Sequence, residues 1–587
     1  MLLYPLVRSR AAAALLLFAF STASAVTRVS IAPDTLRTRN LAQSTTFHVI
    51  PDTLAPGATL QIDLPWGLIG FDPASPPPPL GPDQLDLYAR GAPLQAPARI
   101  ESQATERAIR IRIVHPGPPL SGGDTLSIVP RFVLSPERPG PQTVDFVLTP
   151  ALGTPPRALS APVHVLPSIT LAARTSIEPG APLPIRARAD AALAGTYRVV
   201  VELDSRRIRL EGPGPLLSGH ITAPERPGFY RIRASDPDRL APPALAVVRV
   251  PPNPAAHRIW WADLHGHSDL SDGFGTPEQF YRYARHRSLL DAAALTDHDH
   301  LLDDAEWGRV CALADSMERL PGFSAIPAYE WSSRFGDRNV YLPAHHAPIP
   351  RRGDPWADHV RELQAWARET GAVLVPHHPA SGFRSVDWTL HDPDTEPVCE
   401  VYSIHGWAWT DTTTNPLTPR TPAAQRCATP RLAMAVPGRA YDSARALDPA
   451  LGVIASGDIH TAQPGNLGLA AIRAPSLDRR ALLQALRDRH VYGTTGARIL
   501  LELSADPAPP ESPSVHLHAL AAAPGELASL TLLKNGVPWI RRDRPGFPAA
   551  IDAVDAPSTT TSYQLLAIQT DGERAFSSPI VANPAPA

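Results

Sequence analysis

The sequence predicts a multidomain protein in which a β/α barrel is flanked at both ends by β-sandwich domains. Three observations indicate this architecture. The chain has 587 residues, which is too long for a single hydrophobic core. Its two ends alternate apolar and polar residues between turns rich in Pro and Gly, as β-sandwiches do. Its middle alternates short apolar segments with helical patterns, which favours a parallel β/α sheet or barrel.

The first 25 residues are typical of a secretory signal peptide. Arg8 and Arg10 are followed by an apolar segment, Ala11 to Phe20, and then by the small residues Ala23-Ser24-Ala25. An N-terminal membrane anchor is the alternative, but the short apolar run and the small residues favour cleavage after Ala25. No Cys follows that run to form a lipoprotein signal, and no later segment is long and apolar enough to span a bilayer. We therefore expect an exported protein, either periplasmic or secreted.

Two β-sandwich domains are expected before the central region, over residues 26–166 and 167–250. Alternating segments such as Thr59–Leu64 and Ala108–Ile113 define the first, and Tyr197–Leu203 is typical of the second. Pro251-Pro-Asn-Pro254 predicts a stiff linker into the barrel over residues 255–500.

Five apolar segments of the central region end in residues that can bind metals. The segments are Ile259–Ala262, Ala292–Thr296, Ala325–Tyr329, Ala372–Pro376 and Leu451–Ala455. The residues that follow them are His265 and His267, His298, Glu330, His377 and His378, and Asp458 and His460. The carboxyl ends of parallel barrel strands open on one face, where active sites lie. Chance could supply one or two such endings, but it is a poor explanation of five. The pattern therefore predicts one metal centre.

The helices and the last domain are also legible. Thr276-Pro-Glu-Gln279 combines an N-cap, a Pro in the first turn and a capping-box Gln. Val360 to Thr370 predicts a second helix, which Gly371 closes. Leu482, Leu483 and Leu486 mark the last helix of the barrel. Residues 501–587 predict a third sandwich, in which Lys534-Asn-Gly536 is the turn of a hairpin.

The spacing of His265 and His267 lets both imidazoles bind one ion, because side chains two residues apart on a strand end point the same way. Asp272 follows after a tight turn and can reach the same cavity. Neutral imidazole with carboxylate suits zinc, manganese or iron rather than calcium. Asp458 and His460 repeat the same spacing.

The combined motifs resemble the polymerase and histidinol phosphatase (PHP) superfamily. They are H-x-H at His265, S-D-G at Asp272, T-D-H at His298, the strand-end Glu330, P-H-H at His377 and G-D-x-H at Asp458. Three further stretches are similar to a secreted branch of that family, labelled a domain of unknown function: Glu400–Gly406, Tyr492–Ile499 and Ala575–Ile580. The resemblance is strongest over residues 258–500. It implies a distorted seven-stranded β/α barrel that hydrolyses phosphoesters with two or three divalent ions.

The resemblance also implies which residues bind each ion. His265, His267, Glu330 and Asp458 would bind the first, and Glu330 would bridge to a second that is shared with His377. Asp272, His298 and His460 would bind the third. The family usually places a His where this chain has Asp337. Asp337 is expected to bind the second ion through oxygen, and the alternative is that His345 or His346 takes the position.

Three neighbouring residues are given supporting or open roles. Asp297 points away from His298 and is expected to support or cap. His377 and His378 cannot both point inward from one regular strand, so the family register favours His377 as the ligand and leaves His378 a supporting role. His405 is a candidate for contacting substrate, and a structural histidine is its alternative.

Composition excludes several mechanisms. The net charge of -3 gives no electrostatic case for nucleic-acid binding. Lys534 is the sole lysine, so the barrel has no carboxylated lysine, no lysine Schiff base and no P-loop lysine. The three cysteines, Cys311, Cys399 and Cys427, indicate neither a disulfide scaffold nor a Cys-based zinc site.

The function expected from these observations is hydrolysis of a small-molecule or glycan-linked phosphoester by metal-bound hydroxide. Two alternatives stay open: a metal-dependent amide or lactone hydrolase, and a non-catalytic protein of the cell surface that binds glycans. Sequence alone does not indicate the oligomeric state.

Overall fold

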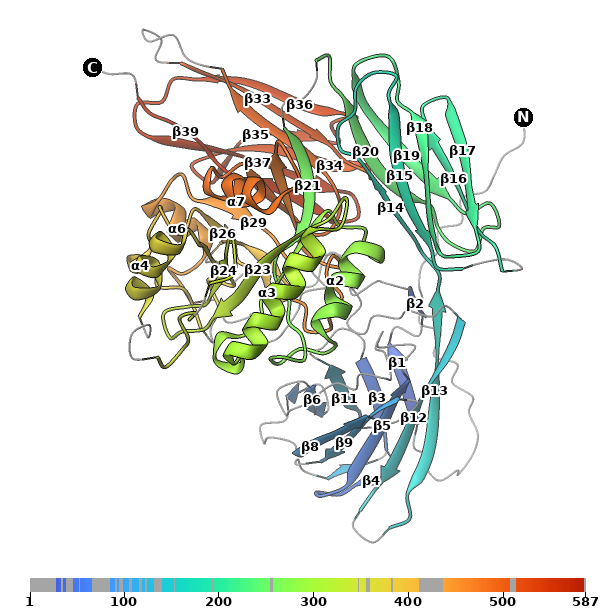
Figure 1. Cartoon of the computed structure of the whole chain (residues 1–587). Coiled ribbons are helices and arrows are strands. Elements are labelled where there is room, and N and C mark those ends of the chain that lie inside the picture. The colour runs from blue at the N-terminus through green and yellow to red at the C-terminus, as the bar shows by residue number, and fades with distance from the viewer. Residues whose placement is uncertain are drawn as a thin grey trace.

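The computed structural model in Figure 1 describes most of the chain from residue 28 to residue 584. The ranges left out are 33–34, 38–45, 52, 66–84, 90–91, 94–98, 105–107, 116–118, 122–123, 131–139, 152–153, 192–194, 254–256, 347, 355–358, 382–383, 411–435 and 507–513. The predicted signal peptide, residues 1–25, and Cys427 therefore lie outside the described residues. The described part has strands β1 to β39 but only five α-helices.

The N-terminal strands form two main sheets around one core. The first sheet has the order β1 (Arg28–Ala32), β3 (Thr46–Ile50), β11 (Leu126–Pro130), β6 (Leu85–Ala89), β7 (Ala92–Pro93). The second has the order β2 (Thr35–Arg37), β13 (Arg157–Leu166), β12 (Gly140–Thr149), β5 (Thr59–Pro65), β9 (Ala108–Val114), β8 (Arg99–Ala104). β4 (Thr53–Leu54) and β10 (Leu120–Ser121) pair separately. Phe47 of one sheet and Ile62 of the other are fully buried in the shared core.

A second pair of sheets follows, with its own core. One has the order β14 (Ile169–Ala173), β15 (Pro182–Ala189), β18 (Leu216–Thr222), and the other β17 (Arg206–Gly212), β16 (Tyr197–Leu203), β19 (Gly228–Ser235), β20 (Ala244–Val250). Strand β15 alternates buried and partly exposed residues, because one face of the sheet packs on the core. Arg231 and Arg249 of this unit make ion pairs with Glu526 and Glu502, so it rests against the C-terminal strands, as Figure 1 also shows.

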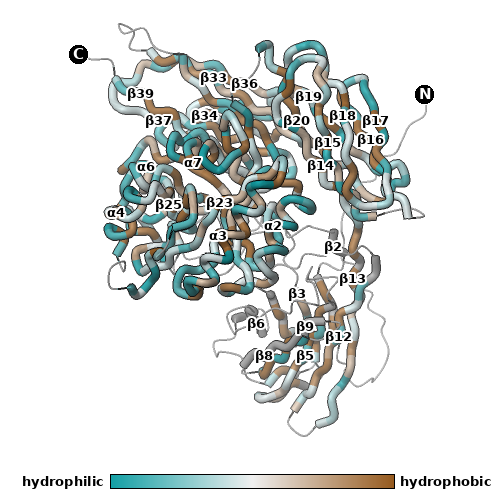
Figure 2. The backbone as a smooth tube through the Cα atoms, viewed as in Figure 1, coloured by the Kyte–Doolittle hydropathy of each residue, from teal (hydrophilic) through white to brown (hydrophobic). Residues whose placement is uncertain are grey.

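The central region is built on a twelve-stranded mixed sheet. Its order is β25 (Val373–Pro376), β24 (Arg338–Tyr341), β23 (Ser324–Trp331), β22 (Ala292–Leu295), β21 (Arg258–Asp263), β30 (Leu469–Ala474), β31 (Val491–Thr494), β38 (Arg574–Ser577), β37 (Thr561–Gln569), β34 (Leu527–Lys534), β35 (Val537–Asp543), with β39 (Ile580–Ala582) paired to β37. Figure 2 shows that its central strands are largely hydrophobic. All residues of β22, β23, β24 and β25 are buried.

The predicted distorted seven-stranded β/α barrel is wrong, because the described strands do not close a ring. Strands β21, β22 and β23 are parallel, but β24 runs antiparallel between β23 and β25. On the other side, β30 is antiparallel to β21 and continues the sheet towards the C-terminal strands. The parallel strands β26 (Val398–Glu400) and β29 (Gly452–Ile454) pair only with each other among the described residues. Apolar runs indicated buried strands correctly, but they do not encode the direction of a neighbouring strand.

The remaining strands are short or belong to the C-terminal part. β27 (Tyr402–Ser403) and β28 (Gly406–Trp407) form a small hairpin. β32 (Leu500–Ala505), β33 (Val515–Ala522) and β36 (Ala549–Asp555) form a three-stranded sheet whose apolar residues share a core with β34 and β37. The predicted hairpin turn joins β34 to β35, with Asn535 and Gly536 at positive φ, 51° and 78°.

The helices are α2 (Pro277–His286), α3 (Asp304–Glu318), α4 (Val360–Thr370), α6 (Tyr441–Leu447) and α7 (Arg479–Arg487), with 3-10 turns at Asp299–Leu301 and Trp388–Leu390. The sequence-based helices are confirmed. Thr276 and Gln279 form the capping box of α2, and Gly371 ends α4 with φ 68°. Within the described ranges, none of the helices has the length and apolarity needed to cross a membrane.

A buried ionic network ties the segment before β26 to its surroundings. Glu396 accepts a hydrogen bond from Arg338 Nε at 3.0 Å and lies 3.1 Å from His391 Nδ1, whose Nε2 lies 3.2 Å from Asp448. Burial alone would lower the pKa of His391, but hydrogen bonds to Asp448 and Glu396 raise it to about 9. The imidazolium therefore stabilises the fold fully below pH 6.5, and this contribution is lost as the pH rises through about 9.

We expect His391→Gln to lower the stability by about 2 kcal/mol at pH 6, because hydrogen bonds to charged groups are lost. The difference from wild type should shrink above pH 9, where His391 is neutral in both states. Chemical denaturation of both proteins from pH 6 to pH 10 measures this. A difference that stays constant over that range would contradict the assigned charge of His391.

Candidate metal centre

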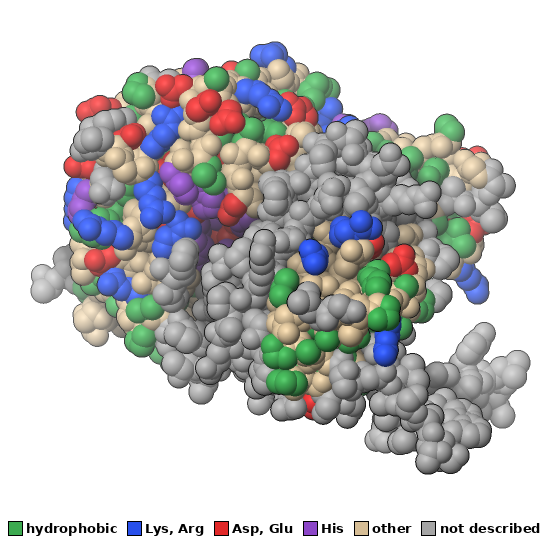
Figure 3. All heavy atoms as spheres, turned by 90° about the horizontal axis from the view of Figure 1, so that it is seen from below, with side chains coloured by type: hydrophobic (Ala, Val, Ile, Leu, Met, Phe, Trp, Pro, Cys, Tyr) green, Lys and Arg blue, Asp and Glu red, His purple; other side chains and the backbone are tan. Residues whose placement is uncertain are grey.

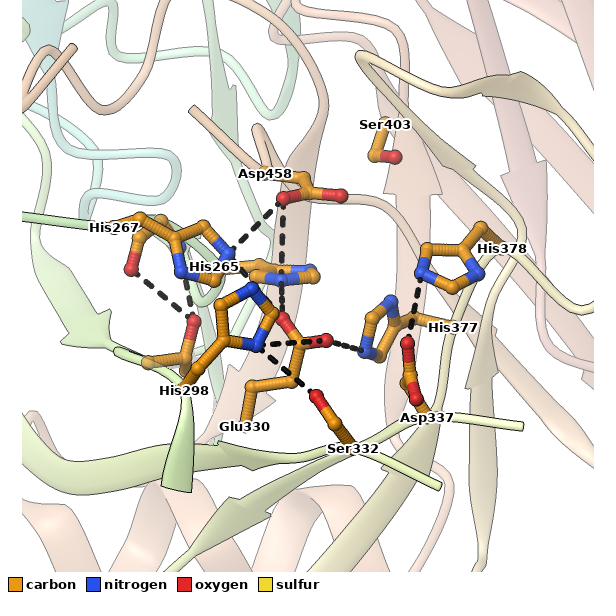
Figure 4. Close-up of polar contacts among 12 residues, drawn as sticks. His265, His267, His298, Glu330, Ser332, Asp337, His377, His378, Ser403 and Asp458 are labelled. Atoms are coloured by element: carbon orange, nitrogen blue, oxygen red, sulfur yellow. Dashed lines mark hydrogen bonds and ion pairs between the residues drawn. The ribbon is translucent and has the colours of Figure 1, made fainter. Parts of the chain in front are cut away.

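The strand ends deliver the predicted ligands to one place. His265 and His267 follow β21, and the main chain between them pairs with the segment that carries Asp458: Asp458 N donates to His265 O at 2.8 Å, and His267 N donates to Ile459 O at 2.9 Å. His298 follows β22 and forms a bridge with Glu330 of β23. Figure 4 shows these side chains converging on the carboxylate of Glu330.

The first group of ligands has the spacing of a tetrahedron. His265 Nε2 lies 3.2 Å from Glu330 Oε2 and 3.3 Å from Asp458 Oδ1, and His267 Nε2 lies 3.2 Å from each of the same oxygens. Ligands bound at 2.0–2.1 Å to a tetrahedral ion lie roughly 3.3 Å apart. His267 Nε2 is buried and makes no hydrogen bond of good geometry within the part of the chain that the structure describes. These four side chains therefore fit a divalent ion.

A second group surrounds the other oxygen of Glu330. His377 Nε2 lies 3.4 Å from Glu330 Oε1, and Asp337 and His378 offer ligand atoms within 4.8 Å of the same set. Both nitrogens of His377 are buried and have no hydrogen-bond partner of good geometry among the described residues. The nitrogens and carboxylate oxygens of this second group therefore also fit a cation.

A third group contains Asp272, His298 and His460. His267 also offers a ligand atom within 4.8 Å of this group. Asp272 Oδ2 lies 3.4 Å from His298 Nε2, and Asp272 Oδ1 lies 3.4 Å from His460 Nε2. Asp272 is the most accessible ligand, with a side chain 47% exposed. The turn that brings it back requires Gly273, where a Cβ would lie 2.6 Å from the main-chain carbon of His267.

Asp337 lies at the second group, held by two neighbours. Its carboxylate accepts a hydrogen bond from Ser333 N at 2.9 Å and pairs with Arg384 Nε at 3.1 Å. Burial, followed by the nearby Glu330, raises the pKa of Asp337 to about 7 against the effect of Arg384. The sequence alternatives, His345 and His346, are exposed and contact the rings of Trp307 and Trp366 instead.

The electrostatics of the centre are those of carboxylates enclosed by imidazoles. Burial would raise the pKa of Glu330, but His298 and His377 hold it well below its usual range. Burial would likewise lower the pKa of His265, yet Asp458 and Glu400 raise it well above its usual range. Protons and metal ions compete for such imidazoles, so ion binding at this centre should strengthen as pH rises.

Three further carboxylates position the ligands. Both oxygens of Glu400, at the end of β26, lie 3.2 Å from His265 Nδ1. Asp263 accepts hydrogen bonds from Gly457 N and Gly465 N at 2.8 and 2.7 Å, which fixes the loop of Asp458 and His460. Asp297 accepts hydrogen bonds from Ser268 and Ser271, which holds the turn before Asp272.

Two residues of the centre were missed or misjudged from sequence. Glu400 begins the sequence motif Glu400–Gly406, but only the fold places its carboxylate against His265 Nδ1. His378 was expected to point away from His377, but Figure 4 shows the rings of both residues next to Asp337. The position of Glu400 at the end of an apolar run could have indicated a role at the centre. The local sequence pattern does not indicate the inward orientation of His378.

His405 lies at the rim of the centre. Its Nε2 is 3.0 Å from Asp458 Oδ2, and its side chain is 38% exposed. In the view of Figure 3, histidine side chains gather at a hollow of the surface with basic side chains beside it. His405 is thus placed to contact both a ligand of the first group and a molecule that enters from solvent.

Comparisons with known proteins give no family. No family model matches the chain, and no curated protein matches it. Among solved structures, the adhesin InvE of Yersinia pseudotuberculosis is similar at 10% identity and a TM-score of 0.13, over 38% of this chain and 58% of that one. A β-glucuronidase of glycoside hydrolase family 2 has 8% identity and a TM-score of 0.15, over 94% and 64%. The chain thus spans less than two thirds of either protein. A biofilm-associated protein domain has 7% identity and a TM-score of 0.16, over 96% of each chain.

We predict that Glu400→Ala weakens metal binding about 10–100-fold, the usual cost of losing the partner of a ligating histidine. Without Glu400, the proton of His265 is no longer kept on Nδ1, and Nε2 presents its lone pair less often. Glu400→Gln retains an acceptor oxygen and should lie much closer to wild type. Competition with a chromophoric chelator measures the affinities. Equal affinity of Glu400→Ala and wild type would contradict this role.

Proposed function

We propose that the chain is an exported metal-dependent hydrolase that cleaves phosphoesters. The observation that carries the proposal is the position of Glu330: each of its oxygens faces a different group of ligands. A buried carboxylate shared in this way is suited to holding ions side by side, as in enzymes that clamp the attacking and leaving oxygens of a phosphoryl group. The residues that would hold two to three zinc, manganese or iron ions are His265, His267, Asp272, His298, Glu330, Asp337, His377, Asp458 and His460.

Divalent ions in this centre would supply Lewis-acid chemistry for ester hydrolysis near neutral pH. The protein's own contribution is to orient the ligands and to exclude other geometries. Burial would lower the pKa of His405, but Asp458 raises it above its usual value. A protonated His405 can then donate a hydrogen bond or a proton to an oxygen of the substrate at the rim.

The sequence motifs also support this proposal. Their resemblance to the PHP superfamily implies phosphoester hydrolysis, although the fold expected with it is not seen in the described residues. Lys534 is the sole lysine of the chain, so a carboxylate such as Glu330 would have to take the role that a carboxylated lysine plays in many amide hydrolases. A small-molecule or glycan-linked phosphoester is the substrate class that we propose.

We expect purified protein to hydrolyse a generic aryl phosphate, and chelator to abolish this activity until zinc or manganese is restored. Asp458→Ala should remove the activity, because Asp458 contacts both histidines of the first group.

His405→Ala should keep its metal but lose about 10²–10⁴-fold in kcat, the usual contribution of an acid–base group. Steady-state kinetics with parallel metal analysis measures each effect.

His300→Ala is a suitable control, since His300 lies beside His298 but belongs to none of the ligand groups of the described residues. Its activity should stay near wild type. Metal-replete protein that leaves phosphoesters intact but opens amides or lactones would favour the rival hydrolase. Protein that binds glycans without turnover of any ester would favour a binding function.

We expect the mature protein to begin at Val26, since the small residues before it form a signal-peptidase site. Mass spectrometry of the N-terminal peptide from the exported fraction tests this. A mature chain that retains Met1 inside the cell would contradict export.

A further inference from the structure

Two consecutive histidines face the same cluster, which regular strand geometry forbids. Successive side chains of a strand point to opposite faces, so one of the pair should turn away. Strand β25 ends at Pro376, and His378 adopts φ 32°. This left-handed turn rotates the His378 ring back beside His377, with ring centroids 4.2 Å apart. Figure 4 shows both rings next to Asp337.

This turn is unfavourable for a residue with a side chain. Positive φ brings Cβ close to the backbone, and it persists at functional sites where surrounding interactions impose it. Just after this turn, Ser381 N donates a hydrogen bond to His378 O at 2.9 Å. Asp458, a ligand of the first group, has a similar conformation with φ 51°. In both cases the strained residue aims a metal-binding side chain inward.

Among the residues that the structure describes, the side chain of His378 has no hydrogen-bond partner at its Nδ1 and only a distant carboxylate at its Nε2. It is only 9% exposed, and its Nδ1 is buried without a hydrogen bond. Its Nε2 lies 3.6 Å from Asp337 Oδ2, which is too long for a hydrogen bond. Asp337 is already compensated by Arg384 at 3.1 Å, so His378 is not needed to neutralise it. A buried imidazole without partners costs free energy unless something else binds it.

We propose that His378 is a metal ligand, and that with Glu330, Asp337 and His377 it forms a four-coordinate site for a divalent cation. Their ligand atoms all lie within 4.8 Å of one another. Two imidazole nitrogens and two carboxylate oxygens suit Zn²⁺, Mn²⁺ or Fe²⁺. Arg384 contacts both oxygens of Asp337, at 3.1 and 3.3 Å, and would hold this carboxylate in place when a cation binds. The inference deepens the proposed metal centre, but its test does not depend on hydrolysis.

The decisive experiment replaces His378 by Cys in the full chain and loads it with Co²⁺. A thiolate bound to cobalt gives a charge-transfer band in the near ultraviolet, which appears only if side chain 378 coordinates the ion. We expect this band in His378→Cys and not in His345→Cys, a control on an exposed loop. Wild-type protein corrects for the native cysteines. Cobalt-loaded His378→Cys without the band overturns the inference.

A second variant separates metal binding from folding. His378→Gly accepts φ 32° without steric cost, so in chelator it should melt a few degrees above wild type. Its affinity for one ion should nevertheless fall about tenfold or more, while the remaining ions bind as before. Unchanged affinity for every ion in His378→Gly would contradict the role of His378. Wild-type protein that takes up no metal would instead refute the metal centre itself.

Discussion

The whole centre depends on one buried carboxylate. Glu330 is 2% exposed, and four imidazoles lie within 3.5 Å of its oxygens: His265, His267, His298 and His377. An ionised carboxylate cannot be buried without compensation, so the elements that supply these histidines must meet at this point. Strands β21, β22 and β25 are each followed within four residues by one or more of them, and β23 supplies the carboxylate. The convergence of these strand ends is therefore both a packing constraint and the geometry of the site.

A layer of polar contacts outside the ligands fixes their directions. Glu400 holds His265, Asp263 holds the loop of Asp458, and Arg384 holds Asp337. Each of these contacts joins segments that are far apart in the chain: Asp263 and Gly457, for instance, are 194 residues apart. The layer links the strand ends to the end of β26 and to the segments that follow β25 and β29. Ligand orientation at this centre is thus a property of the assembled fold and of no single motif.

Features that depend on neighbouring residues could be predicted from the sequence, and contacts between distant segments could not. Apolar runs are followed by candidate ligands, and the structure brings all nine of the predicted residues into groups within 4.8 Å or into contact with them. Helix ends were equally local, as the capping box of α2 and the Gly371 end of α4 illustrate. The barrel was wrong because the sheet stays open. Whether β24 runs parallel or antiparallel to β23 depends on the connection and on competing partners, which hydrophobic patterning does not record.

Residue types at strand ends carried the chemistry of the candidate centre, because alternation along one short segment decides which side chains share a face. Tertiary structure alone decided the partners that come from elsewhere. Glu400 reaches His265 across 135 residues, and Asp337 meets Arg384 across 47. It also decided His378, whose backbone leaves the strand conformation that its neighbours predict. A positive φ is unfavourable for a residue with a side chain, so the strand pattern of the sequence does not predict it, and it persists only within the folded structure around it.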